Sequence, residues 1–314
     1  MRETFRPSPL VVFNFAICGA ALVVALIWAM MLGKGWVSKL ILNPAFIVCL
    51  VLAGFLVVLS LFYAYVRKDA FLARLLLALA IMQCAVFAGV SLTYLVPSAR
   101  FPMMDQAFAR FDSLLGFDFP AFVAWAHARD WVRDYAAAVY NYVTVSIAFV
   151  AMAYLAATRR IEEFEKLVSF IVLSAMLTIF VGMMLPAGST FAYYQVPQAV
   201  EDALGTLTGA GYNVYYGRVR AGDLSVLEEG FRGMIAFPSF HTVLGLMSVL
   251  YLRSNPWLMA PVAILAALMI ATTPLIGGHF LADILGGIAV SLVSYRLVER
   301  LAREPEPTLA YAAS

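Results

Sequence analysis

Long apolar runs separated by short polar breaks occupy most of this chain. Each run is close to the ~20 residues that an α-helix needs to cross the hydrocarbon core of a bilayer. The breaks are rich in charge, as at residues 67–69 and 158–160. We therefore predict an all-α, polytopic membrane bundle of about eight transmembrane helices. The expected spans are residues 10–32, 40–66, 71–97, 135–157, 167–185, 235–252, 257–276 and 279–298.

Two longer segments, 98–134 and 186–234, do not follow this alternation. Within 104–115 apolar residues recur at helical spacing with charged residues between them, and a glycine and a proline follow directly. This pattern predicts an amphipathic helix at the membrane interface that ends at the glycine. Asp105 and Asp112 then lie on its wet face, and a divalent metal site between these two acids is the alternative.

The composition supports a membrane protein. The 314 residues are 63% hydrophobic and only 13% charged, whereas soluble domains carry about 25% charged residues. The formal net charge of +2 gives no indication of nucleic-acid binding. Cys18, Cys49 and Cys84 all fall in apolar runs without metal-ligand or pairing spacing, so we interpret them as buried apolar residues.

Positive charge orients the expected bundle, because cytoplasmic loops are enriched in Lys and Arg. With the N-terminus inside, twelve of the 21 Lys and Arg residues are cytoplasmic. They are Arg2, Arg6, Arg67, Lys68, Arg74, Arg159, Arg160, Lys166, Arg253, Arg296, Arg300 and Arg303. We expect cytoplasmic N- and C-termini in a bacterial inner membrane or a plasma membrane. His241, His279 and the end of the fifth span then share the extracytoplasmic face.

Two short motifs, 38 residues apart, each place a histidine at the start of an expected span. Pro-Ser-Phe-His ends at His241, and Gly-Gly-His-Phe-Leu-Ala-Asp contains His279 and Asp283. Ionisable groups at a membrane boundary are costly and usually functional. His279 and Asp283 are four residues apart and share one helix face. There the Asp accepts a proton from one ring nitrogen and leaves the other as a nucleophile.

Each motif also has a simpler interpretation as a helix start. Ser239 is then an N-cap, and His241 follows it by chance. The functional interpretation uses the same geometry, because free N–H groups and the Ser239 hydroxyl bind phosphate while His241 protonates a leaving oxygen. Gly278, before His279, favours close approach of a ligand to the backbone. Both motifs lie on one side of the membrane, which favours the functional interpretation.

A phosphate site needs cationic partners, for which arginine is the best suited side chain. The loop before the first motif supplies three candidates, with Arg220 as first choice. They are Arg218, Arg220 and Arg232. A solvated loop is the alternative, because acids nearly balance these charges. Ser189, Tyr193 and Tyr194 follow the fifth span, and they either line the same cavity or belong to an interfacial aromatic belt.

The two motifs resemble those of the type 2 phosphatidic acid phosphatase superfamily. Within it, the chain is similar to the branch that contains inositol phosphorylceramide synthase and its bacterial relatives. Further stretches that support this branch are residues 112–118, Arg220-Ala-Gly and the whole of 233–242. The resemblance covers roughly residues 100–298. It implies a catalytic membrane domain at 70–303 with a six-helix core, two additional helices in 1–69 and a tail at 304–314.

The resemblance also implies a mechanism. His279 attacks phosphorus to form a phosphohistidine, Asp283 orients it, and His241 acts as acid and base, without a metal or other cofactor. The implied substrate is a membrane phospholipid or sphingolipid, and the acceptor is a lipid alcohol or water. No nucleic acid is involved.

The chain departs from the phosphatase pattern in its cations. It has no Lys-x6-Arg-Pro string, and Thr272-Thr273 stands where the pattern has Ser-Arg. A phosphodiester carries less negative charge than a monoester. The absence of these phosphate-binding cations therefore slightly favours a phosphodiester-type lipid phosphotransferase over a lipid phosphate monoester phosphatase. A transporter is a remoter alternative, because the first five expected spans carry almost no ionisable residue besides Arg74.

Overall fold

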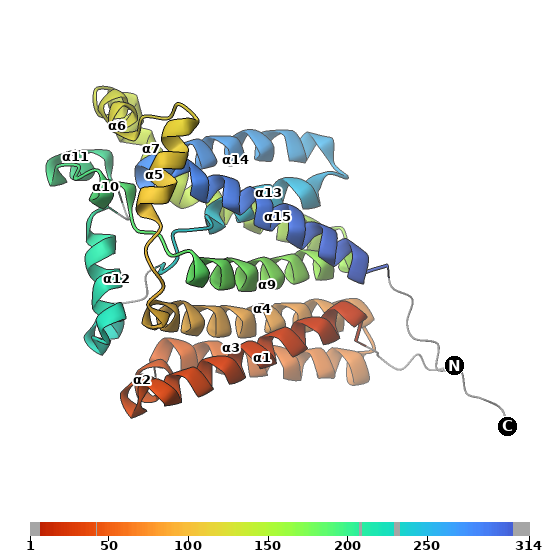
Figure 1. Cartoon of the computed structure of the whole chain (residues 1–314). Coiled ribbons are helices and arrows are strands. Elements are labelled where there is room, and N and C mark those ends of the chain that lie inside the picture. The colour runs from red at the N-terminus through yellow and green to blue at the C-terminus, as the bar shows by residue number, and fades with distance from the viewer. Residues whose placement is uncertain (1–6, 42, 207–208, 229–232, 304–314) are drawn as a thin grey trace.

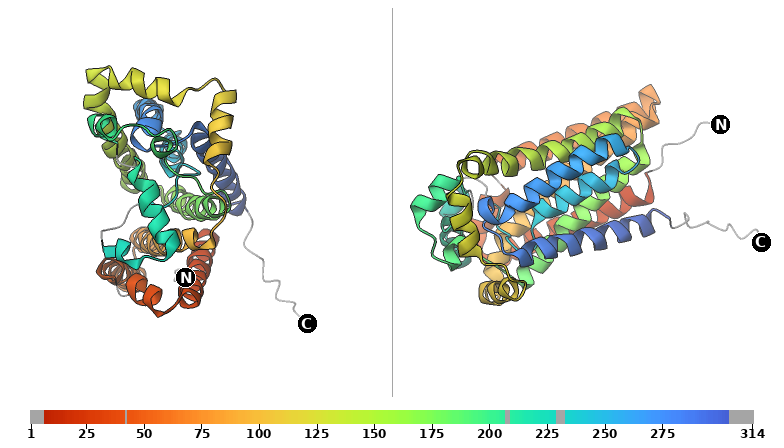
Figure 2. Two further views of the ribbon diagram at one scale, coloured as in Figure 1. Left: turned by 60° about the vertical axis from the view of Figure 1, so that its left-hand side comes forward. Right: turned by 90° about the horizontal axis from the view of Figure 1, so that it is seen from above.

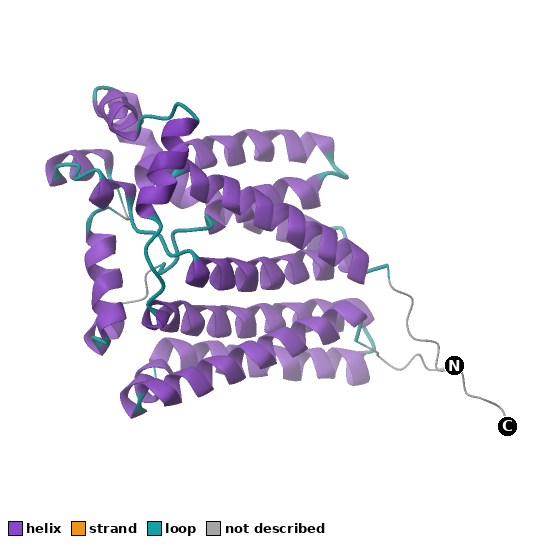
Figure 3. Ribbon diagram, viewed as in Figure 1, coloured by secondary structure: helices purple, strands orange, loops and turns teal. Residues whose placement is uncertain are grey.

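The computed structural model describes residues 7–41, 43–206, 209–228 and 233–303. Within these ranges the regular structure is entirely helical, with no strand (Figure 3). The all-α prediction is therefore confirmed.

In the described part of the chain, seven helices are long and apolar enough to cross a membrane. They are α1 (Pro9–Leu32), α3 (Pro44–Leu61) continued by the π-helical η1 (Phe62–Arg67), α4 (Ala70–Leu95), α7 (Asp130–Ala138) continued by the π-helical η3 (Val139–Val143) and α8 (Thr144–Ala157), α9 (Ile161–Met184), α14 (Pro256–Ile276) and α15 (Leu281–Leu301). Side-chain caps define the N-termini of α1, α4 and α14. Ser8, Asp69 and Asn255 respectively accept a hydrogen bond from the backbone N–H three residues further along the chain.

The sixth expected span is shorter than its apolar run predicted. The helix α13 (Phe240–Leu252) has 13 residues, which gives a length of about 20 Å against the ~30 Å of a hydrocarbon core. The expected start at 235 is wrong, because residues 235–239 approach the helix as non-helical chain. This irregular approach brings backbone and side chains into the candidate site described below.

The long helices form a layered bundle with α4 and α9 at its centre (Figure 1). One side of α4 packs against α1 and α3, while α9 packs against α8, α13 and α15. The helix α14 covers α13 on the far side. The two N-terminal spans therefore pack mainly against α4, and α1 also contacts α9 and α15.

The shorter helices gather at one end of this bundle, and α1 begins and α15 ends at the other (Figures 1 and 2). The short elements are α2 (Lys34–Ile41), η2 (Val96–Ala99), α5 (Asp105–Leu114), α6 (Phe119–His127), α10 (Thr190–Tyr193), α11 (Gln198–Leu204), α12 (Gly211–Ala221) and η4 (Leu224–Glu228). The interruption after the first amphipathic helix occurs at Leu115–Asp118, as the glycine there predicted.

Ion pairs join the long helices at the end of the bundle opposite the short helices. Arg74 of α4 binds both carboxylate oxygens of Glu165 on α9 at 2.8 Å, and the Ser8 hydroxyl at the start of α1 donates to the same carboxylate at 2.7 Å. Lys166 pairs with Glu299 of α15 at 3.5 Å. Arg74, the exception among the first five expected spans, thus links α4 to α9, and its partner Glu165 extends the link to the start of α1.

Candidate active site

His279 and Asp283 meet at the start of α15, but the expected shared helix face was wrong: α15 begins at Leu281, so His279 lies in the loop before the helix and Asp283 in its first turn. Nδ1 of His279 lies 2.8 Å from Oδ2 of Asp283, and the same oxygen accepts the N–H of Phe280 at 3.1 Å. Asp283 is fully buried, and His279 is 6% exposed. An ionised carboxylate can only accept hydrogen bonds, so Nδ1 carries the ring proton and Nε2 keeps its lone pair. This arrangement suits a nucleophilic imidazole.

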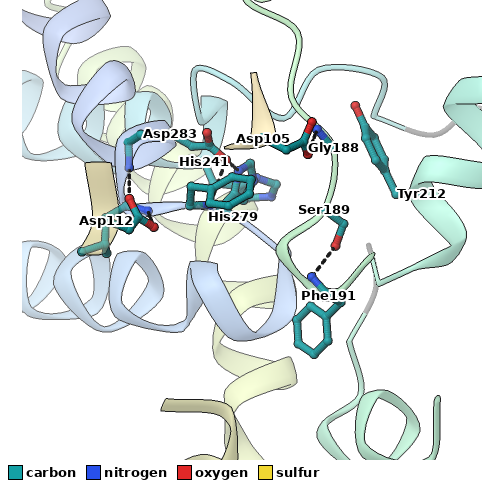
Figure 4. A network of polar contacts seen from close by, with 12 residues as sticks. Asp105, Asp112, Gly188, Ser189, Phe191, Tyr212, His241, His279 and Asp283 are labelled. Atoms are coloured by element: carbon teal, nitrogen blue, oxygen red, sulfur yellow. Dashed lines mark hydrogen bonds and ion pairs between the residues drawn. The ribbon is translucent and has the colours of Figure 1, made fainter. Parts of the chain in front are cut away.

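His241 occupies the first turn of α13, beside His279 (Figure 4). Its ring stacks on Tyr140 of η3 with centroids 4.3 Å apart, and its Nδ1 lies 3.0 Å from the Tyr140 hydroxyl. The sequence interpretation did not single out Tyr140. The available signal was the presence of polar residues inside the fourth expected span, which a lipid-facing helix would avoid.

The two histidines line one cavity of about 230 Å³. Tyr140, Ser189, Tyr212 and Gly278 are among its other lining residues. That space suits a phosphate ester group and the first atoms of its substituents, but not a whole lipid.

Close packing of α15 on the start of α13 brings the two motifs together. A side chain at Gly287 would place its Cβ 2.5 Å from the carbonyl oxygen of Ser239, and one at Gly286 would reach the Phe237 ring at 2.7 Å. The N–H of Ser239 also donates to the carbonyl oxygen of Asp283 at 2.9 Å. The glycine pair therefore allows the contact on which the shared cavity depends.

Ser239 stands at the N-cap position of α13, but its hydroxyl caps no helix N–H. This side chain is fully buried, and its oxygen has no hydrogen-bond partner among the described residues. Gly278 adopts a φ of 62°, a left-handed conformation that favours glycine. Its carbonyl accepts the N–H of Thr190 at 2.9 Å, which ties the nucleophile's loop to the start of α10.

The chain after α9 lines the cavity only in part. Ser189 is a lining residue, but its N–H donates to Asn213 at 2.8 Å and its hydroxyl accepts the N–H of Phe191 at 3.3 Å (Figure 4). Tyr193 and Tyr194 do not line this cavity. They lie beside Arg110 of α5 at a separate surface pocket of about 510 Å³.

The candidate arginines are not gathered at the cavity. Arg220 donates to the carbonyl oxygens of Arg100 and Phe101, each at 2.9 Å. Arg218 pairs with Asp223 at 2.9 Å, and Arg232 lies outside the described residues. Among the residues that the structure describes, the lining of the cavity contains no lysine or arginine.

The two acids of α5 contact different segments of the chain, and Asp112 is not on a solvent-exposed face. Asp112 is 1% exposed, and its two carboxylate oxygens accept the N–H groups of Leu281 (2.9 Å) and Ala282 (3.2 Å). Burial raises the pKa of the Asp112 carboxyl, and these two hydrogen bonds oppose the rise. Asp105 accepts the N–H of Gly188 at 2.9 Å. The expected position of Asp112 was wrong because α5 lies directly against the start of α15, where Asp112 meets backbone donors.

Comparison with known proteins gives one match. The family model of the PAP2 superfamily matches residues 106–297, which is more than half of the chain. The matched region runs from α5 into α15 and contains both histidine motifs. Neither curated proteins nor solved structures gave a match.

Proposed function

Because the chain belongs to the PAP2 superfamily, we propose that it is a membrane enzyme that transfers or hydrolyses a lipid phosphoryl head group through a phosphohistidine. The observation that carries this proposal is the convergence of His241 and the His279–Asp283 pair on one cavity. A nucleophile with its orienting acid and a second proton-carrying group are the parts that such a double displacement requires.

In the first step, the Nε2 lone pair of His279 attacks phosphorus, and the bond between phosphorus and the leaving oxygen breaks. The leaving oxygen takes the bonding electron pair and receives a proton from His241 in its imidazolium form. Asp283 stabilises the positive charge that develops on the His279 ring. The products are a phosphohistidine and a free alcohol.

In the second step, an acceptor hydroxyl attacks the phosphohistidine. His241, now neutral, removes the proton of that hydroxyl, and the bond between phosphorus and Nε2 of His279 breaks. The histidine regains its lone pair, and His241 is again protonated. Water as acceptor gives hydrolysis, and a lipid alcohol gives transfer.

The position of the site supports a lipid substrate. The cavity lies at the end of an apolar bundle, where α13 and α15 begin and α14 ends. A head group can reach this depth while its chains stay among the apolar helix surfaces. The distribution of Lys and Arg supports an extracytoplasmic site with both termini in the cytoplasm.

The cations that the chain lacks relative to the phosphatase pattern favour a phosphodiester over a monoester, and the described lining of the cavity agrees with this, with Arg232 outside the described residues. Its described residues contribute hydroxyl, imidazole and backbone groups, and no lysine or arginine. A monoester dianion needs more positive charge than a singly charged diester. A phosphodiester-type transferase is therefore our first proposal, with a monoester phosphatase as the second.

The proposal is tested with purified protein in detergent. Labelled phosphatidylinositol with diacylglycerol or ceramide is the diester assay, and labelled phosphatidic acid is the monoester assay. His279→Ala removes the nucleophile, and His127→Ala is the matched control, because His127 ends α6 and does not line the cavity.

We expect a new phospholipid from the diester, lost in His279→Ala and retained in His127→Ala. Release of free phosphate from phosphatidic acid, with the same dependence on His279, would instead support the phosphatase. Activity that survives in His279→Ala would refute the phosphohistidine mechanism.

A further inference from the structure

Tyr140 lies in an irregular turn of a membrane-spanning helix, against His241. The segment η3 (Val139–Val143) is π-helical, between the α-helical segments α7 and α8. Such turns are rare and occur frequently at functional sites. Here the turn carries a tyrosine that is only 4% exposed and contacts the cavity. The Thr144 hydroxyl donates to the Tyr140 carbonyl at 3.0 Å, which supplies a partner inside the turn.

The Tyr140 hydroxyl is confined between the two histidine motifs. On one side it lies 3.0 Å from Nδ1 of His241. On the other, a Cβ added at Gly277 would lie 2.6 Å from this hydroxyl and 2.6 Å from Cδ2 of His279. The absence of a side chain at Gly277 thus allows the tyrosine to reach this position.

We propose that Tyr140 is a positioning residue that accepts the Nδ1 proton of His241. The proton that His241 exchanges is then confined to Nε2, the ring nitrogen left for the substrate. This inference rests on the proposed function, in which His241 alternates between imidazolium and neutral imidazole.

Proton balance favours the tyrosine as acceptor. An imidazolium that gives up its Nε2 proton becomes a neutral ring with the remaining proton on Nδ1, and the Tyr140 oxygen accepts that proton. If Tyr140 instead donated to Nδ1, the neutral ring would carry its proton on Nε2, and its release would leave an imidazolate. The phenol proton of Tyr140 is then directed into the cavity that this residue lines.

The two histidines therefore have chemically different partners at the same ring nitrogen. The carboxylate of Asp283 lies against Nδ1 of His279, where it stabilises positive charge that develops on that ring. The neutral phenol of Tyr140 orients His241 without stabilising its imidazolium to the same degree. This difference assigns the nucleophile to His279 and the proton donor to His241, since groups with divergent surroundings take up acid and base roles.

The test compares Tyr140→Phe with Tyr142→Phe. Phenylalanine keeps the stacked ring and removes only the hydroxyl, and Tyr142 lies in the same turn with 74% of its surface exposed. Each variant is assayed on a diester with an alkyl leaving group and on one with a 4-nitrophenyl leaving group, which leaves without protonation.

For the alkyl ester we expect kcat to fall about 10- to 100-fold in Tyr140→Phe, which is part of the 10²–10⁴ that a positioned proton donor contributes. KM and the rate of the initial nitrophenol burst, which reports the first step alone, stay near the wild-type values, and Tyr142→Phe behaves as wild type. An equal loss on both substrates would indicate a merely structural role and would overturn the inference, as would no loss on either.

A second measurement does not depend on activity. The chain has three histidines, so nitrogen NMR of histidine-labelled protein, assigned with His127→Gln and His279→Gln, resolves the His241 ring. We expect neutral His241 to carry its proton on Nδ1 in the wild type and to lose this preference in Tyr140→Phe. A proton on Nε2 in the wild type would overturn the inference. An inactive wild-type protein would count against the proposed function alone.

Discussion

The Asp112 carboxylate links the interfacial helix α5 to the helix that carries the nucleophile. In Asp112→Ala, the N–H groups of Leu281 and Ala282 lose acceptors at 2.9 and 3.2 Å. One of these hydrogen bonds is buried and the other is partly buried. An unsatisfied buried donor costs about 1–3 kcal/mol, and a lost helix cap costs about 0.5–2 kcal/mol.

Desolvation of the carboxylate offsets part of this stabilisation, because burial raises its pKa. We therefore expect Asp112→Ala to lower the free energy of unfolding by about 2 kcal/mol, from the lower part of the combined range. Asp112→Asn keeps one carbonyl acceptor and should lie between the wild type and the alanine variant. In Asp112→Ala we expect catalytic activity to decrease by more than the loss of folded protein explains, because the first turn of α15 positions His279.

The assay is unfolding in mild detergent, followed by far-UV circular dichroism, with activity measured well below the midpoint. Asp118→Ala is the control: Asp118 caps α6 at an exposed position, where it accepts the Ala121 N–H at 3.0 Å, and its loss should cost about 1 kcal/mol or less. Asp112→Ala with the stability and activity of Asp118→Ala would refute the view that α5 holds the site.

Three other substitutions test separate parts of the structure. Asp283→Asn should reduce kcat by about 10³–10⁴-fold with the fold intact, since an amide no longer stabilises the charged imidazole. Trapping of the phosphohistidine at early times measures how fast it forms, and a near wild-type yield of phosphohistidine would contradict the prediction. Arg74→Met leaves the buried Glu165 carboxylate without its ion-pair partner and should lower the free energy of unfolding by about 3–5 kcal/mol. A double variant that also carries Glu165→Leu should regain most of this stability. Thermal melting of both variants checks this, and an unchanged melting temperature in the single variant would exclude a stabilising role. Gly287→Ala forces a Cβ to within 2.5 Å of the backbone oxygen before α13, so it should cost about 1–3 kcal/mol and reduce activity. Gly19→Ala, with nothing within 4 Å of its Cβ, is the control in the same measurements, and equal behaviour of the two would contradict the close packing.

The layout of the fold was largely readable from the sequence. A bilayer imposes a length of apolar helix, so runs of suitable length identify spans with little ambiguity. The boundaries were less certain, because irregular chain such as 235–239 is apolar too. Apolar composition alone does not distinguish helical residues from loop residues that are buried inside a protein.

The sequence by itself indicated the His279–Asp283 pair through its four-residue spacing, although His279 reaches Asp283 from the loop before α15 and not along one helix face. It also indicated His241 through its motif. Only the tertiary structure decided what surrounds them. Tyr140 is 101 residues from His241, and Asp112 is 169 from Leu281. Such contacts depend on how helices pack, and local spacing carries no information about that packing. The same packing gave Arg220 partners away from the cavity, whereas Arg218 pairs locally with Asp223.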